Sequence, residues 1–184
     1  IEHSEIRISN STSISVETLN GAIDSYNVSE TKSIRARGIV NGKFGVAITN
    51  IEDVNTPKYL VDSILSTGKY IEKEEDAIIF EGSKKYVKRN LFNKNLDETP
   101  LDEKLKHLDT IYQIIKEFDP RIENISVSYG ESSTKGSIEN SYGLKLVDKS
   151  NDYVYGAFAT VRDESGEVVN ASDYFFGNDL STFD

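Results

Sequence analysis

Polar and apolar residues alternate along two regions of the chain, roughly residues 4–50 and 123–176. Alternation with a period of two residues is typical of strands that bury one face and leave the other in water. Short turn sequences separate the alternating runs. Neighbouring strands joined by tight turns are antiparallel, because parallel neighbours need a long crossover. The pattern therefore predicts two antiparallel β-rich segments.

The first segment divides into four short strands with turn sequences between them. Asparagine followed by glycine between alternating runs is the strongest short-range signal of a β-hairpin. In chain order, the predicted strands and turns are residues 5–9, Asn10-Ser11, residues 13–17, Asn20-Gly21, residues 33–40, Asn41-Gly42 and residues 44–49. We expect these strands to form a meander.

The second segment begins where a helix is predicted to end. Phe118–Val161 reads as four or five short strands in succession. The predicted turns are Tyr129-Gly130, Ser141-Tyr142-Gly143 and Lys149–Asp152, and Asp163–Gly166 is best explained as a hairpin loop. We expect a second β-rich unit here.

Two stretches between these segments have the period of a helix, near residues 57–70 and 100–118. Each opens with threonine and proline, Thr56-Pro57 and Thr99-Pro100, which suit a cap and the first helical position. The second stretch carries an apolar stripe made of Leu101, Leu105, Leu108, Ile111, Tyr112, Ile115 and Phe118. The predicted fold class is α+β: two antiparallel β-rich segments with two amphipathic helices between them.

Residues 72–98 are the least patterned part of the chain, and we interpret them as a connector. Its one apolar patch, Ile78-Ile79-Phe80, favours a short strand. The acidic run Glu72–Asp76 and the basic cluster Lys84–Arg89 are interpreted as solvated surface.

Two hairpins of the chain resemble each other. Val16–Gly21 lines up with Ile138–Gly143, and Gly38–Gly42 lines up with Thr160–Gly166, with two extra residues in the second loop. An internal repeat of one β-meander would explain this similarity. Chance similarity between polar hairpins would explain it equally well, and both interpretations stay open at this point.

Composition and charge narrow the classes of partner. The 184 residues carry a net charge of −10 and include no cysteine. Disulfides and thiolate metal sites are excluded, and a cytoplasmic location is expected. The acidic balance argues against a nucleic-acid partner. No apolar run approaches the roughly 20 residues that cross a bilayer, so no membrane partner is expected.

The sequence contains no catalytic motif. Its two histidines are His3, near the start, and His107, which we interpret as flanking the apolar stripe of the second helix. No HExxH sequence, phosphate-binding glycine loop or calcium loop is present. We therefore assign no catalytic, cofactor-binding or metal-ligating residue. We expect the chain alone neither to bind zinc tightly nor to cleave peptides.

Four stretches together resemble one protein family. The chain contains a hairpin with Asn-Gly, a pair of strands reading IRARGIVNGKFGVAITN, a helix ending in Asp-Pro-Arg-Ile, and an Asn-Ser-x-Gly turn. Their positions are Ser13–Tyr26, Ile34–Asn50, Ile114–Ile122 and Asn140–Gly143. The set resembles the N-terminal domain of the TldD/PmbA family, often labelled as proposed modulators of DNA gyrase. The acidic charge does not support the gyrase label.

The resemblance implies a subunit of a two-subunit cytoplasmic metalloprotease that acts on unfolded peptides. It implies a homo- or heterodimer with a TldD/PmbA-type subunit. It also implies zinc in a C-terminal domain of the TldD-type subunit, which this sequence does not include. Residues 1–184 are then an N-terminal domain that contacts substrate or partner. The alternative is a stand-alone β-rich binding module without catalytic activity.

The beginning of the chain also suggests a fragment. It starts at Ile1 and contains no methionine, and family members have a helix before the first strand that is not present here. We therefore expect residues 1–184 to be one domain of a longer protein.

Two turns carry a stability expectation. A glycine that closes a tight turn often takes positive φ, so we expect Gly143→Val to destabilise the domain by about 1–3 kcal/mol. We expect Asn20→Ala to cost less, because Gly21 still provides the permissive position.

Overall fold

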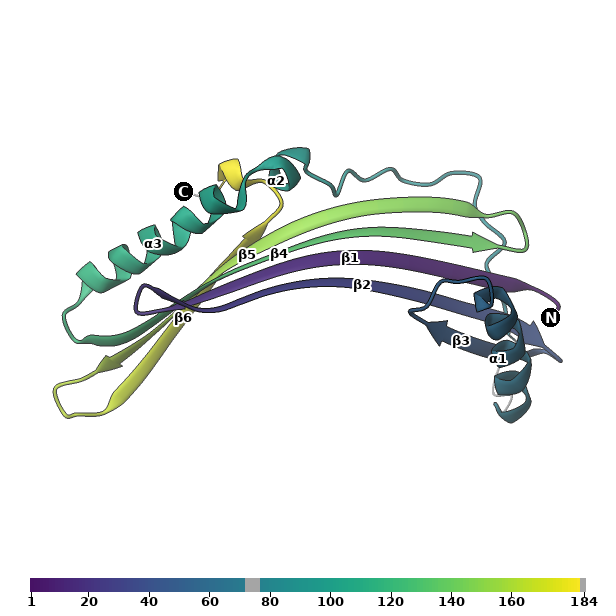
Figure 1. Cartoon of the computed structure of the whole chain (residues 1–184), viewed down its shortest axis with the longest axis horizontal. Coiled ribbons are helices and arrows are strands. Elements are labelled where there is room, and N and C mark those ends of the chain that lie inside the picture. The colour runs from purple at the N-terminus through teal and green to yellow at the C-terminus, as the bar shows by residue number, and fades with distance from the viewer. Residues whose placement is uncertain (72–76, 183–184) are drawn as a thin grey trace. The chain divides into compact units, whose positions relative to one another are not determined.

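The computed structural model describes residues 1–71 and 77–182 of the chain. Six strands form one sheet in the order β3-β2-β1-β4-β5-β6 (Figure 1). The strands are β1 (Ser4–Leu19), β2 (Ala22–Val40), β3 (Lys43–Thr49), β4 (Ile122–Asn140), β5 (Lys145–Arg162) and β6 (Val168–Gly177). The helices are α1 (Thr56–Tyr70), α2 (Lys94–Glu98), α3 (Leu101–Phe118) and the short 3₁₀ helix η1 (Leu180–Thr182).

Strands β1, β2, β4 and β5 run through two compact units. Unit 1 contains Ile1–Ser11, Glu30–Arg89 and Thr134–Lys149. Unit 2 contains Thr12–Ser29, Asn90–Ser133 and Ser150–Asp184. The edge strand β3 and the helix α1 thus belong to unit 1, whereas the edge strand β6 and the helix α3 belong to unit 2.

The core of unit 1 is aliphatic. It consists of the buried residues Ile34, Ala36, Ala47, Leu60 and Ile64, with Ile6, Ile8 and Val40 packed against them. Gly45 of β3 lies directly under Ile64 of α1. A Cβ atom at residue 45 would overlap the carbonyl oxygen of Ile64 and come within 3.0 Å of its Cγ2 atom. Only glycine therefore allows α1 to lie this close to β3.

The core of unit 2 is rich in tyrosine. Its buried residues are Val16, Leu96, Leu108, Ile125, Val127, Tyr129, Tyr153 and Tyr155. The rings of Tyr129 and Tyr155 lie 4.9 Å apart, and those of Tyr153 and Tyr155 lie 5.6 Å apart. Helix α3 covers this face of the sheet, and Leu108 is its buried apolar residue.

A buried ion pair joins α3 to β4 inside unit 2. Lys104 Nζ lies 2.5 Å from Glu131 Oε2, and the two side chains are 4% and 11% exposed. Tyr129 donates its hydroxyl to the same Glu131 oxygen, and Tyr155 donates to the carbonyl of Lys104 at 2.8 Å. Burial raises the pKa of both tyrosines, so both hydroxyls remain protonated donors. The buried charges are therefore paired and hydrogen-bonded.

The predicted α+β class is confirmed, but the strands are fewer and longer than predicted. Three predicted turns, Asn10-Ser11, Tyr129-Gly130 and Lys149–Asp152, lie within β1, β4 and β5 and were wrong. At Asn10-Ser11 the chain pairs across the sheet instead of turning, and Ser11 Oγ lies 2.9 Å from Thr134 Oγ1. Strand pairing thus overrides local turn preference.

The two Asn-Gly turns and the Ser141-Tyr142-Gly143 turn are confirmed. Asn20 and Gly21 have φ of 51° and 82°, and Asn41 and Gly42 have φ of 53° and 72°. Positive φ at both central residues is the geometry that matches the twist of a two-residue hairpin.

Helix α1 includes Thr56, so its cap is Asn55, one residue earlier than predicted. Helix α3 has Pro100 at its cap position, whereas Thr99 ends the short helix α2, which sequence analysis missed. Phe118 was wrongly placed in the buried stripe, since its side chain is 85% exposed.

The predicted strand at Ile78-Ile79-Phe80 is wrong, since these residues are extended but unpaired, although Ile79 is buried. The Glu72–Asp76 run lies outside the described residues. Among the described residues, no helix is long and apolar enough to cross a membrane.

Candidate functional site

The β3 edge is closed by side chains of α1. Val46 N–H donates to Thr67 Oγ1 at 2.8 Å, and the same hydroxyl lies 2.9 Å from the carbonyl oxygen of Val46. Two residues further along β3, the hydroxyl of Tyr59 donates to the carbonyl of Ile48 at 3.3 Å. The outward main-chain groups at the centre of this edge are therefore already bonded.

The hydrogen-bonding pattern of the sheet identifies which main-chain groups of β6 point away from β5. In β5, Arg162 N–H donates towards β4, to Arg121 O at 3.4 Å. Successive residues of a strand direct their main-chain groups to opposite sides, so odd-numbered residues of β5 bond towards β6. The register pairs Gly156 with Tyr174. Even-numbered residues of β6, including Ser172 and Tyr174, therefore direct their N–H and C=O groups to the open edge.

The β6 edge is left open. Tyr174 N–H donates at 2.8 Å to the side chain of the preceding residue, Asp173. Within residues 1–71 and 77–182, no other side chain is hydrogen-bonded to the outward groups of β6. An unpaired row of N–H and C=O groups is a template for another extended chain.

An apolar strip lies on the open face of the sheet beside this edge. It consists of Val154, Phe158, Tyr174 and Phe176, which the β5–β6 register places on the face opposite to Tyr153 and Tyr155. Tyr174 and Phe176 are 66% and 79% exposed. The ring of Tyr174 lies over Gly156, where an added Cβ atom would come within 3.0 Å of it. The Tyr174 ring thus lies against the sheet, and the strip presents aromatic surface to solvent.

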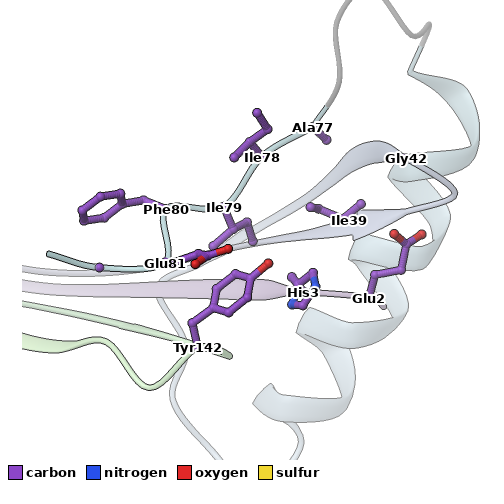
Figure 2. A pocket seen from close by; sticks show the side chains of 11 residues that line it. Glu2, His3, Ile39, Gly42, Ala77, Ile78, Ile79, Phe80, Glu81 and Tyr142 are labelled. Carbon is purple, nitrogen blue, oxygen red and sulfur yellow. The ribbon is translucent and has the colours of Figure 1, made fainter.

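A pocket of about 580 Å³ is the second notable feature, and it lies entirely within unit 1 (Figure 2). It is bounded by the beginning of β1, the end of β2, the β4–β5 turn and the extended segment 77–82. Its lining residues are Glu2, His3, Ile39, Gly42, Ala77, Ile78, Ile79, Phe80, Glu81, Gly82 and Tyr142.

His3 and Tyr142 meet in this pocket. Their rings are stacked, with centroids 4.3 Å apart and an angle of 17° between the planes. Nδ1 of His3 also lies 3.4 Å from Ser141 Oγ, which accepts a hydrogen bond from Ser4 N–H at 3.1 Å. The Ser141-Tyr142-Gly143 turn is therefore joined to the first residues of the chain.

The other candidate residues are not brought together. His107 packs its ring edge-on against Tyr155 at 5.5 Å, in the core of unit 2. Asp163 is occupied in closing its own loop, where Oδ1 accepts from Ser165 N–H at 2.8 Å and from Glu167 N–H at 2.9 Å. The hydroxyl of Ser165 donates to the same Oδ1 atom at 2.6 Å, and this bond, followed by the backbone bonds, lowers the pKa of Asp163. In the described part of the chain, no three histidine or carboxylate side chains are grouped as metal ligands.

Neither the open β6 edge nor the pocket was located from the sequence. A signal for the edge was readable, because Val168–Gly177 contains no lysine, arginine or proline, the residues that commonly protect an edge strand. The pocket had no such signal, because its residues come from four separate parts of the chain.

Two family models match the chain. PmbA/TldA metallopeptidase domain 1 matches residues 4–67, and the PmbA/TldA metallopeptidase central domain matches residues 94–183. Each match contains one three-stranded meander and one long helix, and the sheet order places the first strand of each meander at the centre. A repeated meander produces this order. No curated protein matches the chain at a significant level.

Solved structures share the fold. A proposed modulator of DNA gyrase from Bacteroides thetaiotaomicron aligns with a TM-score of 0.87 and 18% identity, over 98% of this chain and 42% of that one. A proposed modulator of a DNA gyrase from Thermotoga maritima aligns with a TM-score of 0.84 and 20% identity, over 99% and 41%. TldE from Thermococcus kodakarensis aligns with a TM-score of 0.84 and 19% identity, over 98% and 41%.

The chain thus spans about two fifths of the length of these structural neighbours. Family models cover most of its length, in the order domain 1 and then central domain. On this evidence the chain belongs to the TldD/PmbA family, whose models carry the name PmbA/TldA metallopeptidase.

Proposed function

We propose that this chain is the substrate-contacting N-terminal part of a TldD/PmbA-type subunit, in a cytoplasmic zinc metalloprotease that acts on unfolded peptides. The observation that carries the proposal is the contrast between the closed β3 edge and the open β6 edge. An extended peptide can add to an open edge through main-chain hydrogen bonds, which depend little on its sequence.

The apolar strip supports this assignment. A peptide paired with β6 places every second side chain on the face that carries Tyr174 and Phe176. Unfolded chains expose apolar side chains that folded proteins bury. Contact with the strip therefore adds affinity for unfolded segments without requiring a particular sequence.

The catalytic zinc and its ligands belong, in this proposal, to the part of a TldD/PmbA-type protein that these 184 residues do not include. The family resemblance is the basis for that assignment, and also for a homo- or heterodimer with a second TldD/PmbA-type subunit. The chain's own role is to hold an extended substrate rather than to cut it.

Ser172→Pro tests the edge directly. Ser172 directs its N–H outward, so proline removes one donor from the open edge without breaking the bonds between β6 and β5. We expect the affinity for a fluorescently labelled unfolded peptide, measured by anisotropy, to fall about tenfold. Ser172→Ala keeps the N–H group and should bind as the parent chain does. Equal affinity of the proline variant and the parent chain, with unchanged circular dichroism, would contradict the proposal.

The alternative of a stand-alone binding module shares the open edge and differs in its partners. Co-expression with a TldD-type subunit from the same genome separates the two. A stable complex in size-exclusion chromatography supports the protease subunit. Two separate peaks support the binding module.

A further inference from the structure

We propose that the pocket of unit 1 binds an organic ammonium group carried on an apolar chain, as at the N-terminus of a peptide or the end of a lysine side chain. This site is separate from the β6 edge and does not depend on the function proposed for that edge. Its evidence lies in the charge, shape and rigidity of the pocket (Figure 2).

The charge of the pocket favours a cation. Two carboxylates, Glu2 and Glu81, line it, and its lining includes no lysine or arginine. Figure 2 shows Glu2 and Glu81 on opposite sides of His3. Within the described residues, neither carboxylate forms an ion pair with a lysine or arginine side chain. An anion would be repelled by both groups.

The walls of the pocket favour a cation with an apolar body. The side chains of Ile39 and Ile79 line it, and the ring of Tyr142 adds an aromatic surface. An ammonium group near the face of a tyrosine is attracted by the ring quadrupole. A bare metal ion has no apolar body to bury against these walls, whereas an alkylammonium group uses the carboxylates and the walls together.

The pocket is held in shape by hydrogen bonds. Asn140 Nδ2 donates to the carbonyl of Phe80 at 2.6 Å, which joins the segment 77–82 to the β4–β5 turn. The Oδ1 atom of Asn140 accepts from Tyr142 N–H at 2.9 Å and from Leu144 N–H at 3.0 Å. Ile79 is 2% exposed and anchors the same segment. A site held in this way loses little conformational entropy on binding.

Three small probes separate the sources of the ammonium group. Leucinamide carries an α-ammonium group beside an apolar side chain, and Nα-acetyl-lysinamide carries only an ε-ammonium group. Nα-acetyl-leucinamide has the apolar side chain but no ammonium group. Binding is followed by the NMR ring signals of His3 and Tyr142, with His107, which lies outside the pocket, as an internal control.

We expect leucinamide, Nα-acetyl-lysinamide or both to shift the His3 and Tyr142 signals saturably, and Nα-acetyl-leucinamide to shift neither. Whichever ammonium probe binds more tightly identifies the source. Absence of a saturable shift with both ammonium probes up to about 10 mM would overturn the proposal. Equal binding of Nα-acetyl-leucinamide would also overturn it, because the site would then recognise only the apolar group.

Charge-neutral variants complete the test. Glu2→Gln and Glu81→Gln should each weaken binding of the ammonium probe about two- to fivefold, since each removes one partly solvated charge. Glu164→Gln, in the exposed β5–β6 turn, is the matched control and should leave the affinity unchanged. Unchanged affinity in both pocket variants would refute the role of the carboxylates.

Discussion

β3 and β6 are the two edge strands of one sheet, but among the described residues only β3 has its outward main-chain groups bonded by a helix. The α1 side chains Thr67 and Tyr59 supply these bonds. Among the residues that the structure describes, the only side chain bonded to an outward group of β6 is that of Asp173, which accepts from Tyr174 N–H. Exposed edges favour aggregation, so natural proteins usually protect them. An edge left open beside an aromatic strip is therefore evidence of a binding surface.

Helices α1 and α3 differ in what their inward side chains contact. α1 lies against β3, where Gly45 permits close approach, so its polar side chains reach the edge. The buried residues of α3 are Lys104 and Leu108, and they are used within the core of unit 2. Lys104 pairs with Glu131 of β4, two strands away from β6 in the sheet order. The helix of unit 2 thus stabilises its core and leaves its edge free.

Gly45→Val should have the largest effect, because it separates α1 from β3. The added side chain overlaps the backbone of Ile64, which a rotamer change cannot relieve. We expect a loss of at least about 4 kcal/mol in the free energy of unfolding, measured by urea denaturation. Hydrogen exchange should show the loss of protection over residues 43–49.

Gly136→Ala is the control for this substitution. Its added Cβ atom would meet nothing nearer than the carbonyl of Ile8 at 3.9 Å. We expect a change within about 0.5 kcal/mol. Equal urea midpoints for Gly45→Val and Gly136→Ala would show that the close approach of α1 does not close the β3 edge.

Lys104→Ala tests the core of unit 2, which contains the open β6 edge. It leaves the buried Glu131 carboxylate without its cation, and the loss of one partner of a buried ion pair costs about 3 kcal/mol. Hydrogen exchange should show this loss in unit 2, at Ile125, Val127 and Tyr129. Lys94→Ala removes the exposed pair with Glu98 and should cost less than about 0.5 kcal/mol. If Lys104→Ala lowered the free energy of unfolding as little as Lys94→Ala, the buried ion pair would not be a major source of stability in unit 2.

The sequence predicted the elements whose signals are local. The Asn-Gly turns need positive φ, which the residues themselves favour, and the apolar stripe from Leu101 to Ile115 has the helical period. Proline at residues 57 and 100 located the starts of α1 and α3 to within one residue. The family was also identifiable, because its motifs are contiguous in sequence.

The long strands and the candidate sites depend on contacts between distant residues. Tyr129-Gly130 has the composition of a turn but continues as a strand, because β4 pairs with neighbours on both sides. The bonds from α1 to β3 join residues 11 to 21 positions apart, as in Ile48 to Tyr59 and Val46 to Thr67. No local pattern encodes such bonds, so the closure of the β3 edge could not be recognised from the sequence.

Substitutions in two hairpin turns, at Asn20 and Gly143, should have the next largest effect on stability. The structure changes the expectation from sequence that Asn20→Ala costs less than Gly143→Val. Asn20 itself has positive φ, and its Oδ1 atom accepts from Ile125 N–H at 2.9 Å. Gly143 also has positive φ, but an added Cβ atom would meet nothing within 4 Å. We therefore expect Asn20→Ala and Gly143→Val to cost about 2 kcal/mol each, for different reasons. Urea melts compare them.

Asn20→Asp and Gly143→Ala are the matched controls for these two substitutions. Aspartate keeps the acceptor oxygen and tolerates positive φ, so Asn20→Asp should recover most of the loss. Gly143→Ala avoids β-branching and should cost less than the valine variant. A loss below about 0.5 kcal/mol for Asn20→Ala would mean that Gly21 alone sets the turn, as the sequence first indicated.

Thr67→Val has the smallest expected effect on stability, but it tests the comparison between the edges most directly. Valine matches the shape of threonine and removes the hydroxyl, so Val46 loses both of its hydrogen bonds to that side chain at the β3 edge. Water can replace them at this exposed position, and we expect a cost of about 1 kcal/mol.

The opened β3 edge should then gain affinity for an unfolded peptide even when Ser172→Pro has weakened the β6 edge. Anisotropy measurements on Ser172→Pro, with and without Thr67→Val, check this. Thr67→Ser keeps the hydroxyl and should gain nothing. If Thr67→Val also gains nothing, the difference between the two edges lies in the apolar strip beside β6 and not in the free main-chain groups.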